Sequence, residues 1–294
     1  MNEKKVGNLS QVYRAEEITL NGKRCVLVQC ERLELLFNVD NALDIVWAKF
    51  KGVNISFLSK NGLNDGLLDF TGNFEGGFLY TCGMDNISSC VKGKPIHGSM
   101  HYKKAENIKI TRDGEKITVY GEVSERALFG KNLLLKRKYE ITKDCVIIND
   151  VIENQAFTPT EYVLLYHINY GYPFLDESLK LSIPAINSDP LTEIAKKREG
   201  EKFKITPPVD GGDEDVYYHT LKEGKVTLSN PDYGITVEMA YDTEVFPVTL
   251  EWKSMISGDY ALGIEPSITR FDKFQMRTLN PKENKNYNIT ISFK

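Results

Sequence analysis

The sequence lacks several features that would indicate particular classes of function. Lysine and arginine number 37 against 41 aspartates and glutamates, so the net charge is −4 and there is no basic excess to bind a phosphate backbone. No apolar run reaches the roughly 18 residues that span a bilayer. The N-terminus carries charge but no apolar segment of the kind found in secretory signals. We therefore expect a cytoplasmic protein that binds neither nucleic acid nor membrane.

Cysteine and histidine are also scarce. The five cysteines include no CxxC pair, and in a chain without an export signal we expect them to be free, mostly buried thiols. No HExxH, GxxxxGK[ST], GxGxxG or GxSxG motif occurs. Nothing in the sequence therefore indicates a metal, a nucleotide cofactor or a serine nucleophile, and we expect the protein to use no cofactor.

Short apolar segments separated by turn residues fill most of the chain. Turn signals such as Asn21-Gly22 and Asp113-Gly114 recur, and segments spaced about 8–12 residues apart are typical of an all-β protein. Residues 61–76 are rich in glycine, asparagine and aspartate and predict a long, functional loop. Helix signals are limited to residues 191–202. With no linker and no internal repeat, we predict one all-β domain over residues 1–294, a large antiparallel β-sandwich with few short helices.

Two ionisable residues interrupt apolar strands. His167 follows the apolar start of the segment 160–173. We expect this segment to be a central strand, because apolar and polar residues alternate little along it. Glu265 lies within YALGIEPSI, where burial would raise the pKa of its carboxyl toward neutrality. Each has an alternative interpretation. His167 could be a core histidine bonded to a carbonyl, and Glu265 could face water on an edge strand, which Pro266 favours.

A second group of candidates lies in glycine-containing segments. His97 and His101 stand four residues apart in KPIHGSMHYKKA, a spacing that would suit a metal pair on a helix. The proline and glycine of this segment favour a loop instead, and no third ligand lies nearby, so we prefer substrate binding by His97. Asp85 and Asn86 end the segment GGFLYTCGMDN, where they could bind sugar hydroxyls or form an Asx turn.

Several of these segments together resemble one family. GGFLYTCGMDN, PIHGSMHY, LLYHINYGYPFLDE, EWKSM and YALGIEP occur in the order seen in aldose 1-epimerase-like proteins of the galactose mutarotase-like superfamily, more narrowly an uncharacterised bacterial branch. The match LYHxNxGYPxLDE is the most specific of them. An arginine that often follows the first histidine and glycine in the branch is replaced here by Ser99. The resemblance therefore does not define the sugar.

The resemblance implies a sandwich of the galactose mutarotase-like type with a concave sugar-binding face. It implies that His167 is the general acid at the ring oxygen, Glu265 the general base on the anomeric hydroxyl and His97 a substrate-holding residue. We expect an isomerase of the aldose 1-epimerase type acting on a small carbohydrate; a homodimer is left open. A non-catalytic sugar-binding protein, or another epimerase, a lyase or a hydrolase, are the alternatives. Further predicted sugar contacts are Asp85, Asn86, His101, Tyr166, Asn169, Lys253 and Trp252, the last with plain core packing as its alternative.

Overall fold

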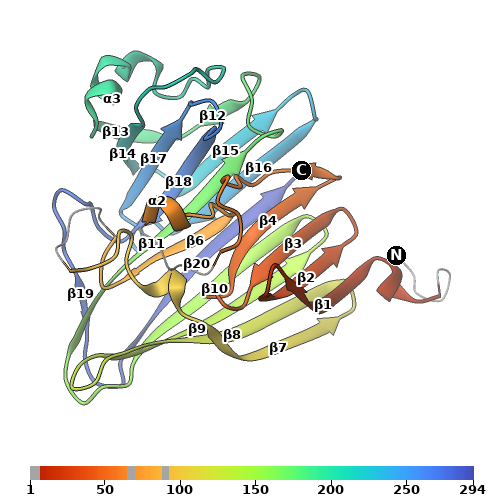
Figure 1. Cartoon of the computed structure of the whole chain (residues 1–294), viewed down its shortest axis with the longest axis vertical. Coiled ribbons are helices and arrows are strands. Elements are labelled where there is room, and N and C mark those ends of the chain that lie inside the picture. The colour runs from red at the N-terminus through yellow and green to blue at the C-terminus, as the bar shows by residue number, and fades with distance from the viewer. Residues whose placement is uncertain (1–6, 65–69, 88–92) are drawn as a thin grey trace.

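The computed structural model describes residues 7–64, 70–87 and 93–294, and strands dominate it. Within these residues the strands form three antiparallel sheets of five, eight and seven strands (Figure 1). Five short helical segments accompany them. Two are α-helical, α2 (Phe70–Asn73) and α3 (Glu193–Lys197), and three are 3₁₀ segments, Leu9–Gln11, Met100–Tyr102 and Glu199–Glu201. The predicted all-β fold with few short helices is confirmed, including the helix near residues 191–202.

The five-stranded sheet follows chain order because each strand turns directly into the next. Asn21 and Gly22 have φ angles of 50° and 79°, the left-handed values that a tight hairpin turn requires, so the predicted turn forms there. This sheet lies at the N-terminal side of the molecule (Figure 1). Its strands are β1 (Tyr13–Leu20), β2 (Lys23–Cys30), β3 (Leu33–Asn38), β4 (Asp44–Phe50) and β5 (Val53–Asn54).

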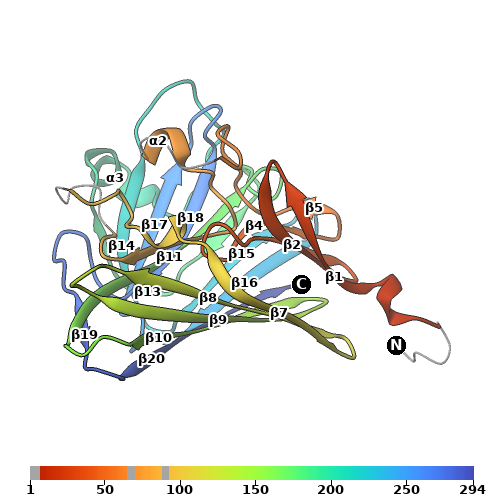
Figure 2. The same ribbon diagram turned by 60° about the horizontal axis from the view of Figure 1, so that its bottom comes forward.

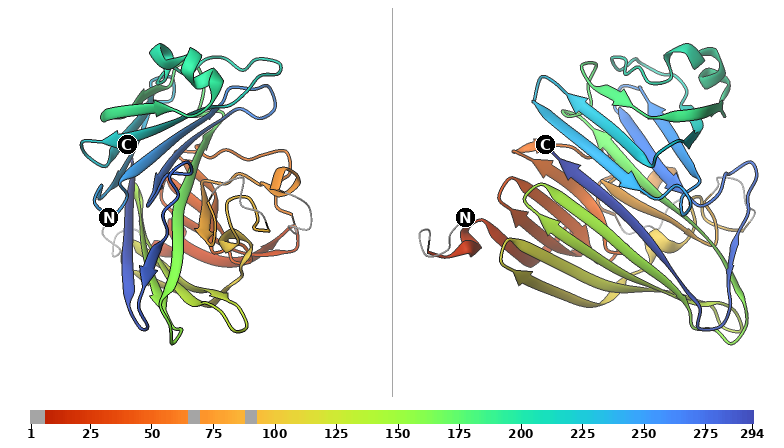
Figure 3. Two further views of the ribbon diagram at one scale, coloured as in Figure 1. Left: turned by 90° about the vertical axis from the view of Figure 1, so that its left-hand side faces the viewer. Right: turned by 180° about the vertical axis from the view of Figure 1, so that it is seen from behind.

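The eight-stranded sheet is a broad layer that is open to solvent on one face (Figure 3, right). In its long strands every second residue is buried, as expected when only one face packs against the core. In sheet order its strands are β12 (Lys180–Ser182), β15 (Lys225–Asn230), β16 (Ile235–Tyr241), β20 (Asn284–Phe293), β10 (Cys145–Asn154), β9 (Asn132–Thr142), β8 (Lys116–Arg126) and β7 (Ala105–Asp113).

The seven-stranded sheet contains the two strands that carry His167 and Glu265. Strand β11 (Thr160–Gly171) pairs with β18 (Ala261–Ser267) and β6 (Leu79–Met84) and is buried on both faces, as its apolar sequence predicts. Strand β18 lies between β17 (Val248–Ser254) and β11 and is fully buried, so the edge-strand alternative for Glu265 is wrong. Pro266, which has no N–H to donate, lies where the β11–β18 pairing is interrupted, between the pairs Leu165–Ser267 and Ile168–Ile264. The other strands are β13 (Ala185–Pro190), β14 (Asp215–Leu221), β17 (Val248–Ser254) and β19 (Arg277–Leu279).

A buried ionic network joins the sheets behind β11. The Arg137 guanidinium on β9 is fully buried and lies 2.7 Å from an Asp150 oxygen and 2.6 Å from an Asp44 oxygen. The Tyr166 hydroxyl donates a hydrogen bond of 2.6 Å to Asp150. Buried charges are tolerated when they are paired and hydrogen-bonded in this way. The Tyr166 face of β11 therefore packs against this network, and the His167 face points away from it.

The helical segments lie at the edges of the sheets. Helix α3 begins at its N-cap Thr192, whose hydroxyl accepts a hydrogen bond from the Ala195 N–H, and it lies beside β13 and β14 (Figure 1). Helix α2 lies on the side of the molecule where β17 and β18 are seen (Figure 2). Over the described residues, none of the helices has the length and apolar character that crossing a membrane would require.

Candidate functional site

The structure places His167 and Glu265 in direct contact. The antiparallel register sets Ile168 opposite Ile264, which brings the two ionisable side chains together on one face of the sheet. His167 Nε2 lies 3.2 Å from Glu265 Oε1, and the side chains are only 5% and 2% exposed. The imidazole and the carboxyl thus stand side by side on one wall rather than on opposite sides of a cavity.

Both side chains line a cavity of about 680 Å³, within the range of roughly 300–1,000 Å³ typical of small-molecule sites. The predicted residues His97 and Trp252 also line it. The apolar part of the lining is Phe57, Phe70, Phe74, Ile96, Leu191, Val216, Leu250, Trp252, Ile256 and Phe271. The polar part is Ser59, Lys60, Asn61, Thr71, His97, His167, Thr192, Glu214, Ser254, Asp259 and Glu265.

Aromatic rings form the wall beside the ionisable pair. The Trp252 ring centroid lies 5.4 Å from that of His167 and 6.3 Å from those of Phe57 and Phe74, each in an edge-on arrangement. Such contacts orient the indole and leave an apolar aromatic surface within the cavity. A ring of this kind suits the C–H face of a sugar, whose hydroxyls point to the sides.

Burial shifts the two ionisable groups in the direction of their neutral forms. Loss of solvation, followed by the nearby Glu214 charge, raises the pKa of Glu265 to about 8. Loss of solvation, followed by repulsion from His97, lowers the pKa of His167 well below its usual value. Near neutral pH the pair therefore holds a protonated carboxyl next to a neutral imidazole, which is one proton donor beside one proton acceptor.

His97 approaches the same cavity from a tight turn. Its φ is 60°, and Gly98 follows at 84°, where a side chain would collide with the carbonyl oxygens of Gly83 and Asn86 at 2.2 Å. His97 Nδ1 lies 3.0 Å from the Ile87 carbonyl oxygen, so Nδ1 carries the proton and Nε2 is the acceptor. Burial lowers the pKa of His97, so the ring is neutral.

The family described as a domain of unknown function, DUF4432, matches residues 21–293. The chain belongs to the DUF4432 family. No curated protein matches it. The fold of this DUF4432 protein is that of solved galactose mutarotase-like structures, which agrees with the resemblance seen in the sequence.

Three solved structures illustrate the likeness of this DUF4432 protein. A Klebsiella pneumoniae protein provisionally named an aldose 1-epimerase has a TM-score of 0.85 at 17% identity, covering 100% of this chain and 86% of that one. A galactose mutarotase-like protein from Clostridium acetobutylicum has a TM-score of 0.72 at 15% identity, covering 97% and 99%. A galactose mutarotase related enzyme from Lactobacillus acidophilus has a TM-score of 0.61 at 13% identity, covering 96% and 97%. At these identities the likeness establishes the fold.

Several residues predicted to contact a sugar do not line the cavity. Asp85 instead accepts hydrogen bonds from the backbone N–H and the hydroxyl of Ser99, at 3.0 and 3.2 Å. The Asn86 amide donates to the Pro95 carbonyl at 2.9 Å. Both side chains therefore hold the loop that presents His97, which is a structural contribution close to the site rather than a place in its lining.

His101 also has a different environment from His97. It lies in the 3₁₀ segment Met100–Tyr102, stacks on Tyr80 with a centroid distance of 3.7 Å, and places Nδ1 2.8 Å from Asp44. The alternative of a histidine pair on one helix face is therefore wrong. Among the residues described by the structure, no group of three or more histidine, cysteine, aspartate or glutamate side chains is arranged to hold a metal ion.

Strand alternation separates the remaining candidates. Tyr166 precedes His167 and so points to the opposite face of β11, where it contacts Asp150. Lys253 follows Trp252 and likewise points away from the cavity, toward the carboxylates of Glu251 and Asp215 at 3.4 and 3.8 Å. Asn169 shares the His167 face but is fully buried beside it and does not line the cavity.

One glycine makes room for the ionisable pair and was not singled out from the sequence. Gly263 precedes Glu265 by two residues on β18 and shares its face. A Cβ atom at Gly263 would lie 2.9 Å from Glu265 Oε1, 3.0 Å from His167 Cε1 and 3.1 Å from Trp252 Cε3. The missing side chain therefore leaves the space in which these three groups meet.

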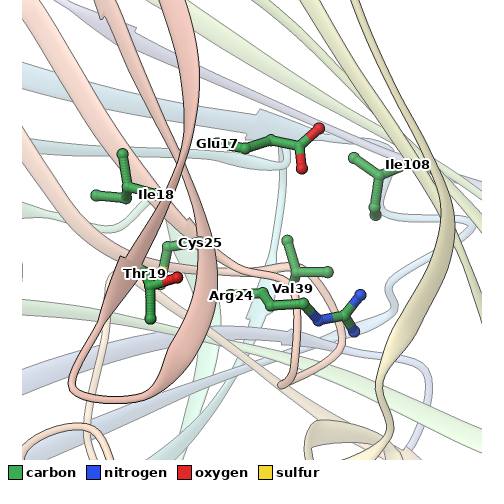
Figure 4. Close-up of a pocket in the computed structure, with 7 residues that line it drawn as sticks. All are labelled: Glu17, Ile18, Thr19, Arg24, Cys25, Val39 and Ile108. Atoms are coloured by element: carbon green, nitrogen blue, oxygen red, sulfur yellow. The ribbon is translucent and has the colours of Figure 1, made fainter.

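A second, smaller hollow of about 180 Å³ lies between β1, β2 and β7 (Figure 4). Its cation, Arg24, is already paired with Asp40 at 2.8 Å. Its thiol, Cys25, has a pKa that burial raises to about 11, so it is not an anionic nucleophile at neutral pH. Cys25, Cys30, Cys82 and Cys145 are free thiols, as predicted, and Cys90 lies outside the described residues. The larger cavity is the better candidate site.

Proposed function

We propose that the protein is an aldose 1-epimerase that interconverts the anomers of a free sugar. The observation that supports this most directly is the contact of 3.2 Å between His167 Nε2 and Glu265 Oε1 in the large cavity. Anomer exchange needs one group that takes a proton and one that gives a proton at adjacent oxygen atoms. A neutral imidazole and a protonated carboxyl, side by side, meet that requirement.

In the proposed opening step His167 Nε2 takes the proton of the anomeric hydroxyl while the Glu265 carboxyl protonates the ring oxygen. The bond between C1 and the ring oxygen breaks, and a C1 carbonyl forms. After rotation about C1–C2, the imidazolium returns its proton to the carbonyl oxygen and the carboxylate takes the proton of the attacking hydroxyl. This assignment reverses the roles implied by the resemblance, because burial favours the proton on Glu265 in the resting protein.

His97 and Trp252 would bind the sugar in this scheme. His97 Nε2 is an acceptor because Nδ1 is committed to the Ile87 carbonyl, so it would accept a hydrogen bond from a sugar hydroxyl. Trp252 would stack on the apolar face of the ring. Neither contact changes during proton transfer, so both contribute mainly to binding.

The charges in the cavity favour a sugar without an acidic group. The lysine of the lining, Lys60, is paired with Asp259 at 2.9 Å, and Glu214 adds a negative charge. No arginine occurs among the described lining residues. A phosphate or carboxylate on the sugar would meet a net negative wall with no free guanidinium to pair with it. We therefore propose a neutral aldose as substrate.

The test is the rate of anomer exchange with freshly dissolved single anomers of neutral aldoses, followed by polarimetry. The protein should accelerate exchange, and Glu265→Gln and His167→Gln should each reduce the acceleration by about 10²–10⁴-fold. Glu238→Gln, on the solvent-facing side of β16, is the matched control and should leave the rate unchanged. Full activity in both site variants would exclude the proposed chemistry. Sugar binding in calorimetry with no acceleration by the wild-type protein would indicate a binding protein instead.

A further inference from the structure

The Asn169 side chain has only one orientation that its surroundings allow. Its Nδ2 group donates to the Gly77 carbonyl oxygen at 2.9 Å and to the His167 carbonyl oxygen at 3.2 Å. Carbonyl oxygens only accept, so the amide nitrogen must occupy this position and cannot exchange places with Oδ1. The residue is fully buried on β11, so the orientation of Oδ1 is fixed as well.

Two buried polar atoms near the ionisable pair have no conventional hydrogen-bond partner. They are Asn169 Oδ1 and His167 Nδ1, which belong to residues two apart on the same face of β11. The Asn169 amide lies against His167, because its Nδ2 is 3.2 Å from the His167 carbonyl oxygen. Burial and the neighbouring His97 lower the pKa of His167, and the Asn169 side chain acts in the opposite direction, as an amide oxygen beside the ring would.

We propose that Asn169 is a positioning residue that keeps the neutral His167 ring in the tautomer with its proton on Nδ1. An amide oxygen cannot donate, so it favours an N–H at the ring nitrogen next to it. The Nε2 atom is then unprotonated and directed at Glu265 Oε1, 3.2 Å away. Gly263, which pairs with Asn169 across β18, contributes no side chain that could compete for Oδ1.

The other tautomer would be unfavourable at the Asn169 end of the ring. Its bare Nδ1 would face the Asn169 oxygen, which sets two acceptors against each other in a buried place. Its Nε2–H could donate to the Glu265 carboxyl but could not accept a proton. For the epimerase reaction the consequence is specific, because only a bare Nε2 can take the proton of the anomeric hydroxyl. This consequence rests on the proposed function, whereas the tautomer itself does not.

The tautomer can be measured on the resting protein without any sugar. Long-range ¹H–¹⁵N correlation spectra at pH 7 distinguish the protonated from the bare ring nitrogen, and the chain has only four histidines. The signals that disappear in His167→Gln belong to His167. We expect a protonated Nδ1 and a bare Nε2. A protonated Nε2 in the wild-type protein would overturn the inference whether or not the protein epimerises sugars.

Substitution of Asn169 tests the cause. In Asn169→Ala we expect a mixture of His167 tautomers, and for sugar exchange a kcat at least about tenfold lower with little change in KM, because Asn169 does not line the cavity. The control is Asn230→Ala. Asn230 is equally buried and also donates two hydrogen bonds, but on β15, so its loss should leave tautomer and kcat unchanged. An unaltered tautomer in a folded Asn169→Ala protein would contradict the proposal; if that variant does not fold, the wild-type spectrum still decides.

Discussion

Removing the ionisable proton of Glu265 should make the protein more resistant to alkaline pH. A carboxyl in an unfolded chain has a pKa of about 4.3, whereas burial raises that of Glu265 to about 8 in the folded protein. Between these values the folded protein binds more protons than the unfolded chain, so its free energy of unfolding falls as pH rises. Glu265→Gln has no proton to lose and should not show this part of the decline.

The size of the effect follows from the two pKa values. Most of the difference between pH 6 and pH 9 arises before the folded carboxyl itself ionises, near pH 8. Linkage over that interval gives a loss of roughly 2–3 kcal/mol in unfolding free energy for a single group with these values. A loss of this size is large compared with the 5–15 kcal/mol that typically separates folded from unfolded proteins.

The assay is urea unfolding of the wild-type protein and Glu265→Gln at pH 6, 7, 8 and 9. The quantity of interest is the difference between the two unfolding free energies at each pH, because other titrating groups cancel in it. From pH 6 to pH 9 the unfolding free energy of Glu265→Gln should rise by roughly 2–3 kcal/mol relative to that of the wild-type protein. Glu238→Gln is the control, since Lys225 holds the pKa of that carboxyl below its usual value and outside this interval. A difference that does not change from pH 6 to pH 9 would show that Glu265 is already ionised, and the proposed proton donor would be lost with it.

Three further outcomes are expected. The rate of anomer exchange should be bell-shaped in pH, falling as Glu265 ionises near pH 8 and falling again well below pH 6.5 as His167 becomes protonated; a rate that does not fall between pH 7 and 9 would contradict the assignment of Glu265 as proton donor. Gly263→Ala should lower kcat by up to about 10²-fold through displacement of the pair, with a melting temperature near that of the wild type; unchanged kcat would refute the spatial argument. Asp150→Asn should lower the unfolding free energy by about 3 kcal/mol or more, because Arg137 loses a buried partner; a urea-measured loss below about 1 kcal/mol would show that the network matters little.

The fold could be predicted largely from the sequence because its signals are local. Turn residues and alternating apolar segments depend on neighbours within a few positions, and the Asn21-Gly22 hairpin and the one-sided strands of the large sheet follow them. The pairing of β11 with β18 has no such signal, because about 100 residues separate the two strands along the chain. The site depends on that pairing, and only the family resemblance indicated that His167 and Glu265 belong together.

Strand alternation would have improved the prediction of the cavity lining. Leu250, Trp252 and Ser254 share one face of β17 and all line the cavity, whereas Lys253 lies between them and faces the other way. The same rule separates Tyr166 from His167. The lining contributed by loops, such as Lys60, Asn61 and Phe74, has no comparable periodicity. Within the predicted loop at residues 61–76, Asn61, Thr71 and Phe74 line the cavity, while Phe70–Asn73 forms helix α2 instead of loop and residues 65–69 lie outside those described.

Two buried carboxyls, Asp150 and Glu265, lie on opposite sides of β11 and have different electrostatic environments. On the Tyr166 face, Asp150 lies 2.7 Å from the fully buried Arg137, so the cost of desolvation is offset by a cation in contact. On the His167 face, Glu265 has a neutral ring as its neighbour, and its pKa rises because burial and the Glu214 charge act in the same direction. The two carboxyls differ in whether a cation contacts them and not in how deeply they are buried, since both side chains are almost completely buried. The two environments lie on opposite faces of β11, because Tyr166, which contacts Asp150, and His167, which contacts Glu265, are consecutive residues. In the proposed reaction, the absence of a paired cation at Glu265 keeps a proton on its carboxyl near neutral pH, where it can be transferred.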